Sequence, residues 1–108
     1  MKYIKLPVAI EAQQFTDEMK DRVYRWASEK QTNIYPTKDE YGHPILVIPT
    51  LEGEMICRIN DYLIEEPFPT DDRKFYPCKP SIFKQTYALL PNDEKERLLL
   101  NKIINKKI

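Results

Sequence analysis

The residue that most suggests chemistry is Cys78, in the segment Tyr76-Pro77-Cys78-Lys79-Pro80. A neighbouring lysine and the N-terminus of a following helix both lower the pKa of a thiol, so this position could carry a nucleophilic or redox-active thiolate. The alternative is a small, buried and inert cysteine at the corner between a strand and a helix. The only histidine, His43, stands in a polar loop, and nothing places it beside Cys78. We therefore assign no catalytic residue, keep Cys78 as the one candidate, and favour the inert interpretation.

Other catalytic classes lack the residues that they need. Two cysteines and one histidine at unrelated spacings form no Cys-x-x-Cys element, so we predict no metal site. The adjacent acids at 65–66 and 71–72 lie in a proline-containing stretch and indicate a solvated loop better than a hydrolytic carboxylate pair. Glycine occurs only at Gly42 and Gly53, which excludes a glycine-rich phosphate loop. We therefore expect no cofactor.

Aromatic residues gather in the second half of the chain among several cations. The simpler interpretation is core packing with a few surface tyrosines. The more specific interpretation is a ligand pocket in which an aromatic side chain stacks on the base of a nucleotide while a lysine binds its phosphate. The ligand-binding candidates under this hypothesis are Asp61, Tyr62, Tyr76 and Lys79.

Composition bounds the class of protein. A chain of 108 residues with 42% hydrophobic residues fits one small soluble domain. The 17 basic and 17 acidic residues give zero net charge, which argues against non-specific nucleic-acid binding. No stretch resembles a signal peptide or a membrane span, and two cysteines fit free thiols in a reducing cytoplasm.

Periodicity predicts an α+β fold with a small antiparallel sheet. Apolar residues alternate over 4–12, which predicts a strand, and Pro7 indicates that this strand lies at a sheet edge or is bulged at that point. Thr16 is a suitable cap for a helix whose buried stripe would be Met19, Val23, Trp26 and Ala27. A short strand is expected near 33–35. Strands over 45–48, 55–59 and 62–64 would then form a meander packed against that helix, before a loop over 65–74.

Two further helices are expected toward the C-terminus. After a short extended segment at 75–78, Pro80 suits the first turn of a helix near 80–88, with Ile82, Phe83, Thr86 and Tyr87 on its inner face. Residues 91–108 are predicted to form an amphipathic helix outside the α+β domain of residues 1–90. Its apolar stripe would be covered either by the parent domain or by a second copy, which makes a homodimer through 91–108 one hypothesis.

Several stretches of the chain together resemble a known family. They are Thr50-Leu51-Glu52-Gly53, Asn60-Asp61-Tyr62 and Phe75-Tyr76-Pro77-Cys78-Lys79-Pro80-Ser81-Ile82-Phe83, with a matching opening segment. The pattern resembles a small-protein family of bacteriophages and prophages, whose members pair a Gly-Asp-Tyr or Gly-Asp-Trp turn with Phe-Tyr-Pro-Cys-Lys-Pro-Asp-Ile-Phe. This chain departs from the pattern at Asn60 and Ser81, and both residues can serve the same local structure.

The resemblance implies phage or prophage origin but no biochemical activity. We therefore expect an accessory protein that acts by binding an unidentified protein or small molecule. The alternatives are a protein that sequesters a nucleotide-type ligand or counters host defence, and, third, a thiol-dependent enzyme that uses Cys78.

Overall fold

The fold was analysed in a computed structural model that describes residues 1–4, 6–71 and 73–89. Its helices and strands are given below in chain order, and the first and last strands belong to the same sheet. They are β1 (Ala12–Gln14), α1 (Lys20–Ser28), β2 (Tyr35–Lys38), β3 (Pro44–Thr50), β4 (Gly53–Arg58), β5 (Tyr62–Glu65), β6 (Phe75–Cys78) and α2 (Pro80–Thr86). The predicted α+β class is confirmed.

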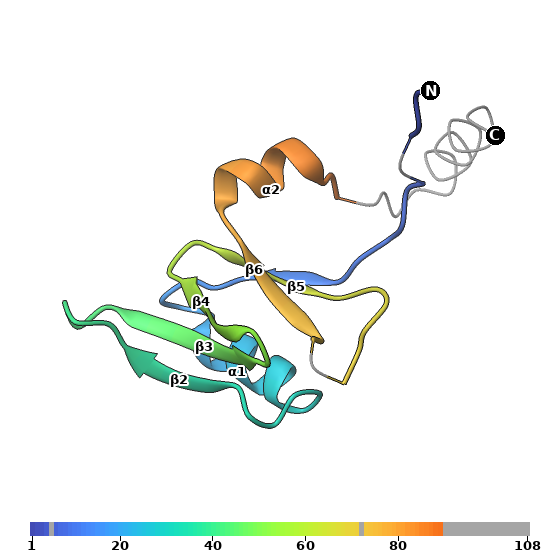
Figure 1. The fold of residues 1–108 in the computed structure, drawn as a ribbon. Helices are drawn as coiled ribbons and strands as arrows, with labels where there is room; N and C mark the ends of the chain where they lie inside the picture. The colour runs from blue at the N-terminus through green and yellow to red at the C-terminus, as the bar shows by residue number, and fades with distance from the viewer. Residues whose placement is uncertain (5, 72, 90–108) are drawn as a thin grey trace.

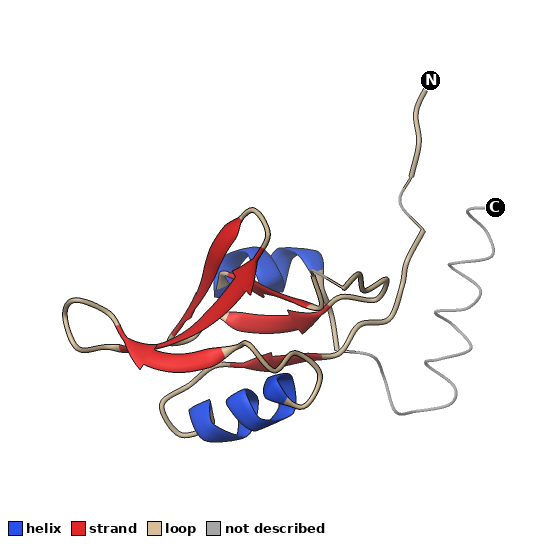
Figure 2. Ribbon diagram, turned by 60° about the horizontal axis from the view of Figure 1, so that its bottom comes forward, coloured by secondary structure: helices blue, strands red, loops and turns tan. Residues whose placement is uncertain are grey.

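The strands form two antiparallel sheets of three strands each, with the orders β1-β5-β6 and β2-β3-β4. Figures 1 and 2 show α1 and α2 on opposite sides of these sheets. The chain between β1 and β5 builds the whole second sheet, so β1 and β5 pair only after that excursion. The first sheet therefore joins segments that are far apart in the sequence.

The predicted single meander is wrong at its third strand. The β3–β4 hairpin forms as expected and closes with Thr50 opposite Gly53, whose φ of 128° a side chain would strain. The chain then leaves this sheet at Asn60, which has a φ of 77°. The Asp61 carboxylate accepts the Arg58 N–H at 2.9 Å, and the Asp61 carbonyl accepts the Phe15 N–H at 2.8 Å. This turn directs β5 to β1 and β6.

The predicted strand over 4–12 is also wrong, because regular pairing is confined to Ala12–Gln14. The last inter-strand bond before β1 runs from the Glu65 N–H to the Glu11 carbonyl at 2.8 Å. Beyond Glu65 the partner segment contains Pro67 and Pro69, which have no N–H to donate, so the ladder ends there. Residues 1–4 and 6–10 consequently lie away from the two sheets (Figure 1).

The first helix starts three residues later than a cap at Thr16 predicts. Thr16 accepts the Met19 N–H through its hydroxyl at 3.1 Å and closes a turn, and α1 begins at Lys20. Met19 is therefore exposed, whereas Val23 and Ala27 are fully buried as predicted. The predicted strand near 33–35 is likewise displaced to Tyr35–Lys38.

The main core lies where α1 meets both sheets. Trp26 packs edge-on against Phe75, with ring centroids 5.1 Å apart. The fully or almost fully buried members of this core are Phe15, Val23, Ala27, Ile34, Leu46, Ile48, Cys57, Leu63 and Phe75. Since they come from α1 and both sheets, the core depends on the chain crossing between the sheets.

The helix α2 matches its prediction closely. Pro80 occupies its first turn and Lys79 its N-cap. Phe83 and Tyr87 face inward, but Ile82 is 51% exposed and does not belong to the inner face. The predicted helix over 91–108 and the domain boundary at 90 lie outside the described residues.

The positive φ at Asn60 generates a first prediction. Asn60→Val should lower the free energy of unfolding by roughly 1–2 kcal/mol, because a β-branched residue resists left-handed backbone geometry. Asn60→Gly, the matched control, should stay within about 1 kcal/mol of the parent. Urea denaturation followed by Trp26 fluorescence measures both, and equal losses for the two variants would contradict the assigned role of the turn.

Candidate functional site

The ring-bearing candidates meet between the first sheet and α2. Alternation along β5 directs Leu63 into the main core and Tyr62 to the opposite side. Cross-strand pairing sets Tyr62 opposite Cys78 and Ile64 opposite Tyr76. We call Tyr62, Tyr76, Phe83 and Tyr87 the aromatic layer, since these side chains fill the space under α2.

The members of the aromatic layer contact one another closely. Tyr62 stacks on Phe83 with a centroid distance of 3.8 Å and an angle of 5°, and Phe83 contacts Tyr87 at 4.9 Å. The hydroxyls of Tyr76 and Tyr87 are hydrogen bonded at 3.2 Å. The layer thus pairs two of its three hydroxyls internally and stacks three of its rings on one another.

A cation covers the Tyr76 ring from the loop between β5 and β6. The Arg73 guanidinium carbon lies 5.1 Å from the Tyr76 ring centroid, within the range of a cation–π contact. The Arg73 side chain is also 3.7 Å from the Glu66 carboxylate. Phe83 and Arg73 therefore each cover a ring face, of Tyr62 and Tyr76 respectively, on which a base would stack.

Asp61 has a structural role in the turn described above. Its carboxylate accepts a backbone N–H, so one oxygen is already committed. Its negative charge also reaches both thiols, since it contributes to the raised pKa of Cys57 and of Cys78. Asp61 precedes Tyr62 in the chain but contributes no described contact to the aromatic layer.

The Cys78 thiol has the opposite pKa shift to the one that its neighbours suggested. Burial, followed by the charge of Asp61, raises its pKa above the ordinary value. Its sulfur lies 3.6 Å from the Lys79 carbonyl, while the Lys79 side chain is exposed. His43 is held elsewhere, with Nδ1 3.6 Å from the Asp39 carboxylate. The raised pKa therefore disfavours a thiolate, and His43, the histidine of the described residues, does not act as a base at Cys78.

The second thiol is more deeply buried. Cys57 is fully buried in the main core, and desolvation raises its pKa to about 12. Neither cysteine forms a disulfide. Cys57 thus behaves as a small apolar core residue.

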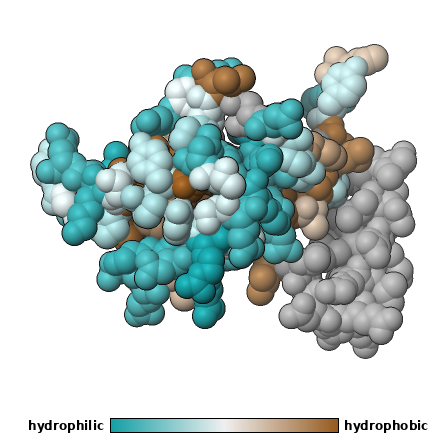
Figure 3. Space-filling view, turned by 90° about the horizontal axis from the view of Figure 1, so that it is seen from below, coloured by the Kyte–Doolittle hydropathy of each residue, from teal (hydrophilic) through white to brown (hydrophobic). Residues whose placement is uncertain are grey.

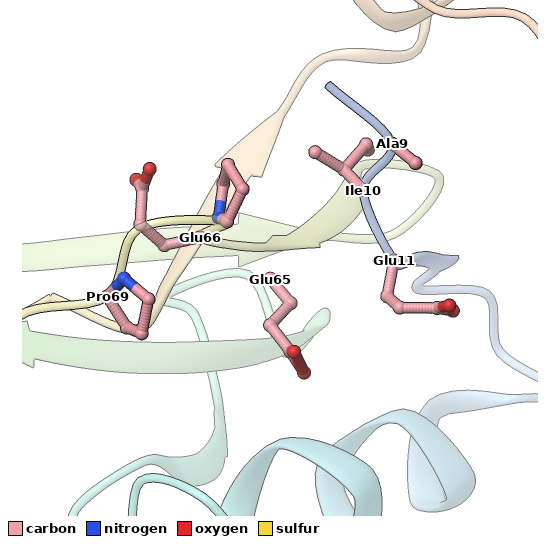
Figure 4. Close-up of a pocket in the computed structure, with 7 residues that line it drawn as sticks. Ala9, Ile10, Glu11, Glu65, Glu66 and Pro69 are labelled. Atoms are coloured by element: carbon pink, nitrogen blue, oxygen red, sulfur yellow. The ribbon is translucent and has the colours of Figure 1, made fainter.

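Two grooves on the described surface lie away from the aromatic layer. One, of about 230 Å³, separates residues 9–11 from the loop at 65–69 (Figure 4). In Figure 4 the carboxylates of Glu11, Glu65 and Glu66 point in different directions, so they do not converge on one ligand. Lys30 pairs with Glu65, which leaves that acid committed.

The second groove, of about 260 Å³, lies between α1 and the second sheet. Phe15, Tyr24, Pro36 and Ile45 line it with Lys38 at its edge. Neither groove contains any of the four predicted ligand-binding residues. Those residues therefore do not define either cavity.

Two further site classes find no support in the described part of the chain. Within residues 1–4, 6–71 and 73–89, no three acidic, histidine or cysteine side chains are grouped so as to hold a metal ion. In the same residues, neither helix has the length and hydrophobicity that crossing a bilayer requires.

Sequence reasoning named the aromatic residues but not their pairing. Phe83 and Tyr87 are four residues apart and so share a helix face, which is a signal that could have indicated a contact with a neighbouring strand. The choice of Tyr62 and Tyr76 as their partners depends on the β5–β6 register. Apart from Pro7, nothing in the sequence indicates that the side chains of Ile4, Leu6 and Val8 are exposed.

Comparison with known proteins adds no relative, since no family model, curated protein or solved structure matches the chain.

The tyrosine pair generates a prediction about alkaline pH. Burial, and then the hydrogen bond with Tyr87, raises the pKa of Tyr76 above its ordinary value of 10.0. A group with a raised folded-state pKa stabilises the fold below its unfolded pKa and loses that contribution as pH rises further. Stability should therefore fall above about pH 10, and Tyr76→Phe should flatten this fall while costing about 1 kcal/mol at neutral pH.

Urea denaturation at several pH values measures this effect. Tyr41→Phe is the matched control, because Tyr41 is 76% exposed. The alkaline titration of Cys57 is common to all three proteins and cancels in the comparison. An unchanged pH slope in Tyr76→Phe would contradict the assignment.

The two thiols give a further prediction. An aromatic disulfide reagent should modify Cys78 slowly at neutral pH and faster as pH rises, because the raised pKa keeps the thiol protonated. The fully buried Cys57 should react only after unfolding. Cys78→Ser should abolish the native-state reaction, and rapid modification of Cys78 at mildly acidic pH would instead indicate an activated thiolate.

Proposed function

We propose that this chain is an accessory protein of phage or prophage origin that acts in the host cytoplasm by binding a partner and not by catalysis. The family resemblance supports the origin. The observation that carries the mode of action is the internal contact within the aromatic layer, where Tyr62 stacks on Phe83 and the Tyr76 and Tyr87 hydroxyls are paired. A contact made by exposed groups fits this arrangement better than an enclosed small-molecule site.

Lys79, one of the candidate residues, and Ile82 are both exposed at the start of α2. Lys79 is exposed at the N-cap of α2, and Ile82 is 51% exposed one turn further along the helix. Residues three apart on a helix are neighbours, so a cation and an apolar side chain share one surface. A protein partner with an acidic and apolar surface would be complementary to it.

The alternative function is sequestration of a nucleotide-type ligand. Arg73, Tyr76 and Lys79 supply the cation and ring chemistry that such a ligand requires. Binding there requires the Tyr62–Phe83 or Arg73–Tyr76 contact to open. A thiol-dependent enzyme remains the third candidate, and the raised pKa of Cys78 argues against it. A homodimer through 91–108 remains a prediction.

A nucleotide panel in a thermal-shift assay tests the choice between the first two. A ligand that binds the native state raises the unfolding temperature with its saturation, so the proposed function predicts a flat panel at millimolar nucleotide. A rise of several degrees that Arg73→Ala abolishes, and that Lys38→Ala leaves intact, would favour sequestration. Retention of the full biological effect by Cys78→Ser would exclude the enzyme.

A further inference from the structure

The groove between α1 and β2 is an apolar surface that lies apart from the aromatic layer. Its volume is about 260 Å³. Phe15 and Ile45, which are buried, contribute to its lining together with the half-buried Tyr24. Figure 3 shows the molecule from below, with a small hydrophobic area among hydrophilic side chains on this face.

The register of the second sheet determines which side chains face α1. Pro36 lies opposite Leu46, and Lys38 lies opposite Pro44. Leu46 belongs to the main core beneath α1. Since alternate residues of a strand share one face, Pro36, Lys38 and Pro44 lie on the same side of the sheet as Leu46. Two prolines and one lysine of the sheet therefore face the helix.

The backbone of β2 is poorly suited to pairing with another strand. The Asp39 N–H is donated to the His43 carbonyl at 2.9 Å, so Asp39 and Thr37 address β3. Successive residues of an antiparallel strand address opposite sides, which directs Pro36 and Lys38 away from β3. Because Pro36 has no N–H, that side of β2 lacks a donor. The groove therefore offers side chains to a ligand and not a strand edge.

Lys38 is a cation without a partner in the described part of the chain. Its side chain is exposed and has neither a hydrogen bond nor an ion pair there. The adjacent acid, Asp39, is committed to other groups. Its carboxylate accepts the N–H groups of Tyr41 and His43 and lies 3.3 Å from the Arg58 guanidinium. The charge of Lys38 is therefore available to a ligand in the groove.

The other charges of the groove balance one another on its α1 side. The Lys20 ammonium lies 2.9 Å from the Asp17 carboxylate. Asp21 is also close enough to act on Lys20, since its charge contributes to the raised pKa of that lysine. The unbalanced charge of the lining is therefore positive and belongs to β2, at Lys38.

We propose that this groove binds a small aromatic carboxylic acid in its ionised form. The ring would lie against the apolar side chains of Phe15, Tyr24 and Pro36, and the carboxylate would pair with Lys38. One unpaired cation is complementary to one carboxylate. The volume falls below the range of about 300–1,000 Å³ that is usual for drug-sized ligands, so one or two rings on a short chain are expected.

A nuclear magnetic resonance titration of the full chain with indole-3-propionate tests the proposal. The amide signals of Tyr24, Thr37 and Lys38 should shift in a saturable manner, with a dissociation constant at or below about 1 mM. Tryptamine is the matched control ligand, because it carries the same ring and an ammonium in place of the carboxylate. It should bind several times more weakly than the acid.

Three variants separate the charge of Lys38 from other effects. Lys38→Gln should weaken binding of the acid roughly threefold to fivefold, which is the contribution of an exposed ion pair. Lys38→Glu should reverse the preference, so that tryptamine binds better than indole-3-propionate. Lys84→Gln is the matched control, since Lys84 is exposed on α2, and it should leave binding unchanged.

The outcomes decide the proposal without reference to the aromatic layer. The absence of saturable shifts at about 5 mM acid would overturn it. So would equal binding of the two probes, an acid affinity that Lys38→Gln leaves unchanged, or shifts confined to Tyr62, Phe83 and Tyr87. The amide spectrum of each free variant verifies its fold. A failure here leaves the proposed function intact, because that function is tested with nucleotides and Arg73→Ala.

Discussion

The turn from Arg58 to Asp61 is the constraint on which the rest of the structure depends. Asn60 adopts a left-handed backbone there, the Asp61 carboxylate holds the Arg58 N–H, and Phe15 exchanges backbone hydrogen bonds with Asn60 and Asp61. These bonds redirect the chain from the second sheet into the first. After this turn β5 pairs with β1, and Leu63 lies in the core between α1 and both sheets. The tolerance of asparagine for positive φ therefore favours the change of direction.

The same turn explains why the candidate residues behave structurally. Asp61 directs the chain, and Tyr62 and Cys78 lie opposite each other immediately after it. The aromatic layer then attaches α2 to the outer face of the first sheet. Burial beside the Asp61 carboxylate raises the pKa of both thiols, since a negative charge and a low dielectric both disfavour a thiolate. A segment with the composition of a reactive site thus serves as a junction between strand and helix.

The two ends of the first sheet differ in how they are covered. The β6 end carries α2 directly, so its side chains are paired with those of the helix. The β1 end leads into residues that belong to no described strand and that include the exposed side chains of Ile4, Leu6 and Val8.

Local physics in the sequence determined the α+β class, the β3–β4 hairpin, the strand at Phe75–Cys78 and the helix that begins at Pro80. Each of these depends on neighbouring residues: the turn at Gly53, apolar alternation, and the fixed φ of proline. Only the tertiary structure decided that the strands divide between two sheets, that Phe83 stacks on Tyr62, and that Ile4, Leu6 and Val8 remain exposed. These outcomes depend on which distant segment supplies a hydrogen-bonding partner. The alternation of residues 4–12 is the same whether a partner strand exists or not, and the prolines that prevent one stand more than fifty residues later, at Pro67 and Pro69.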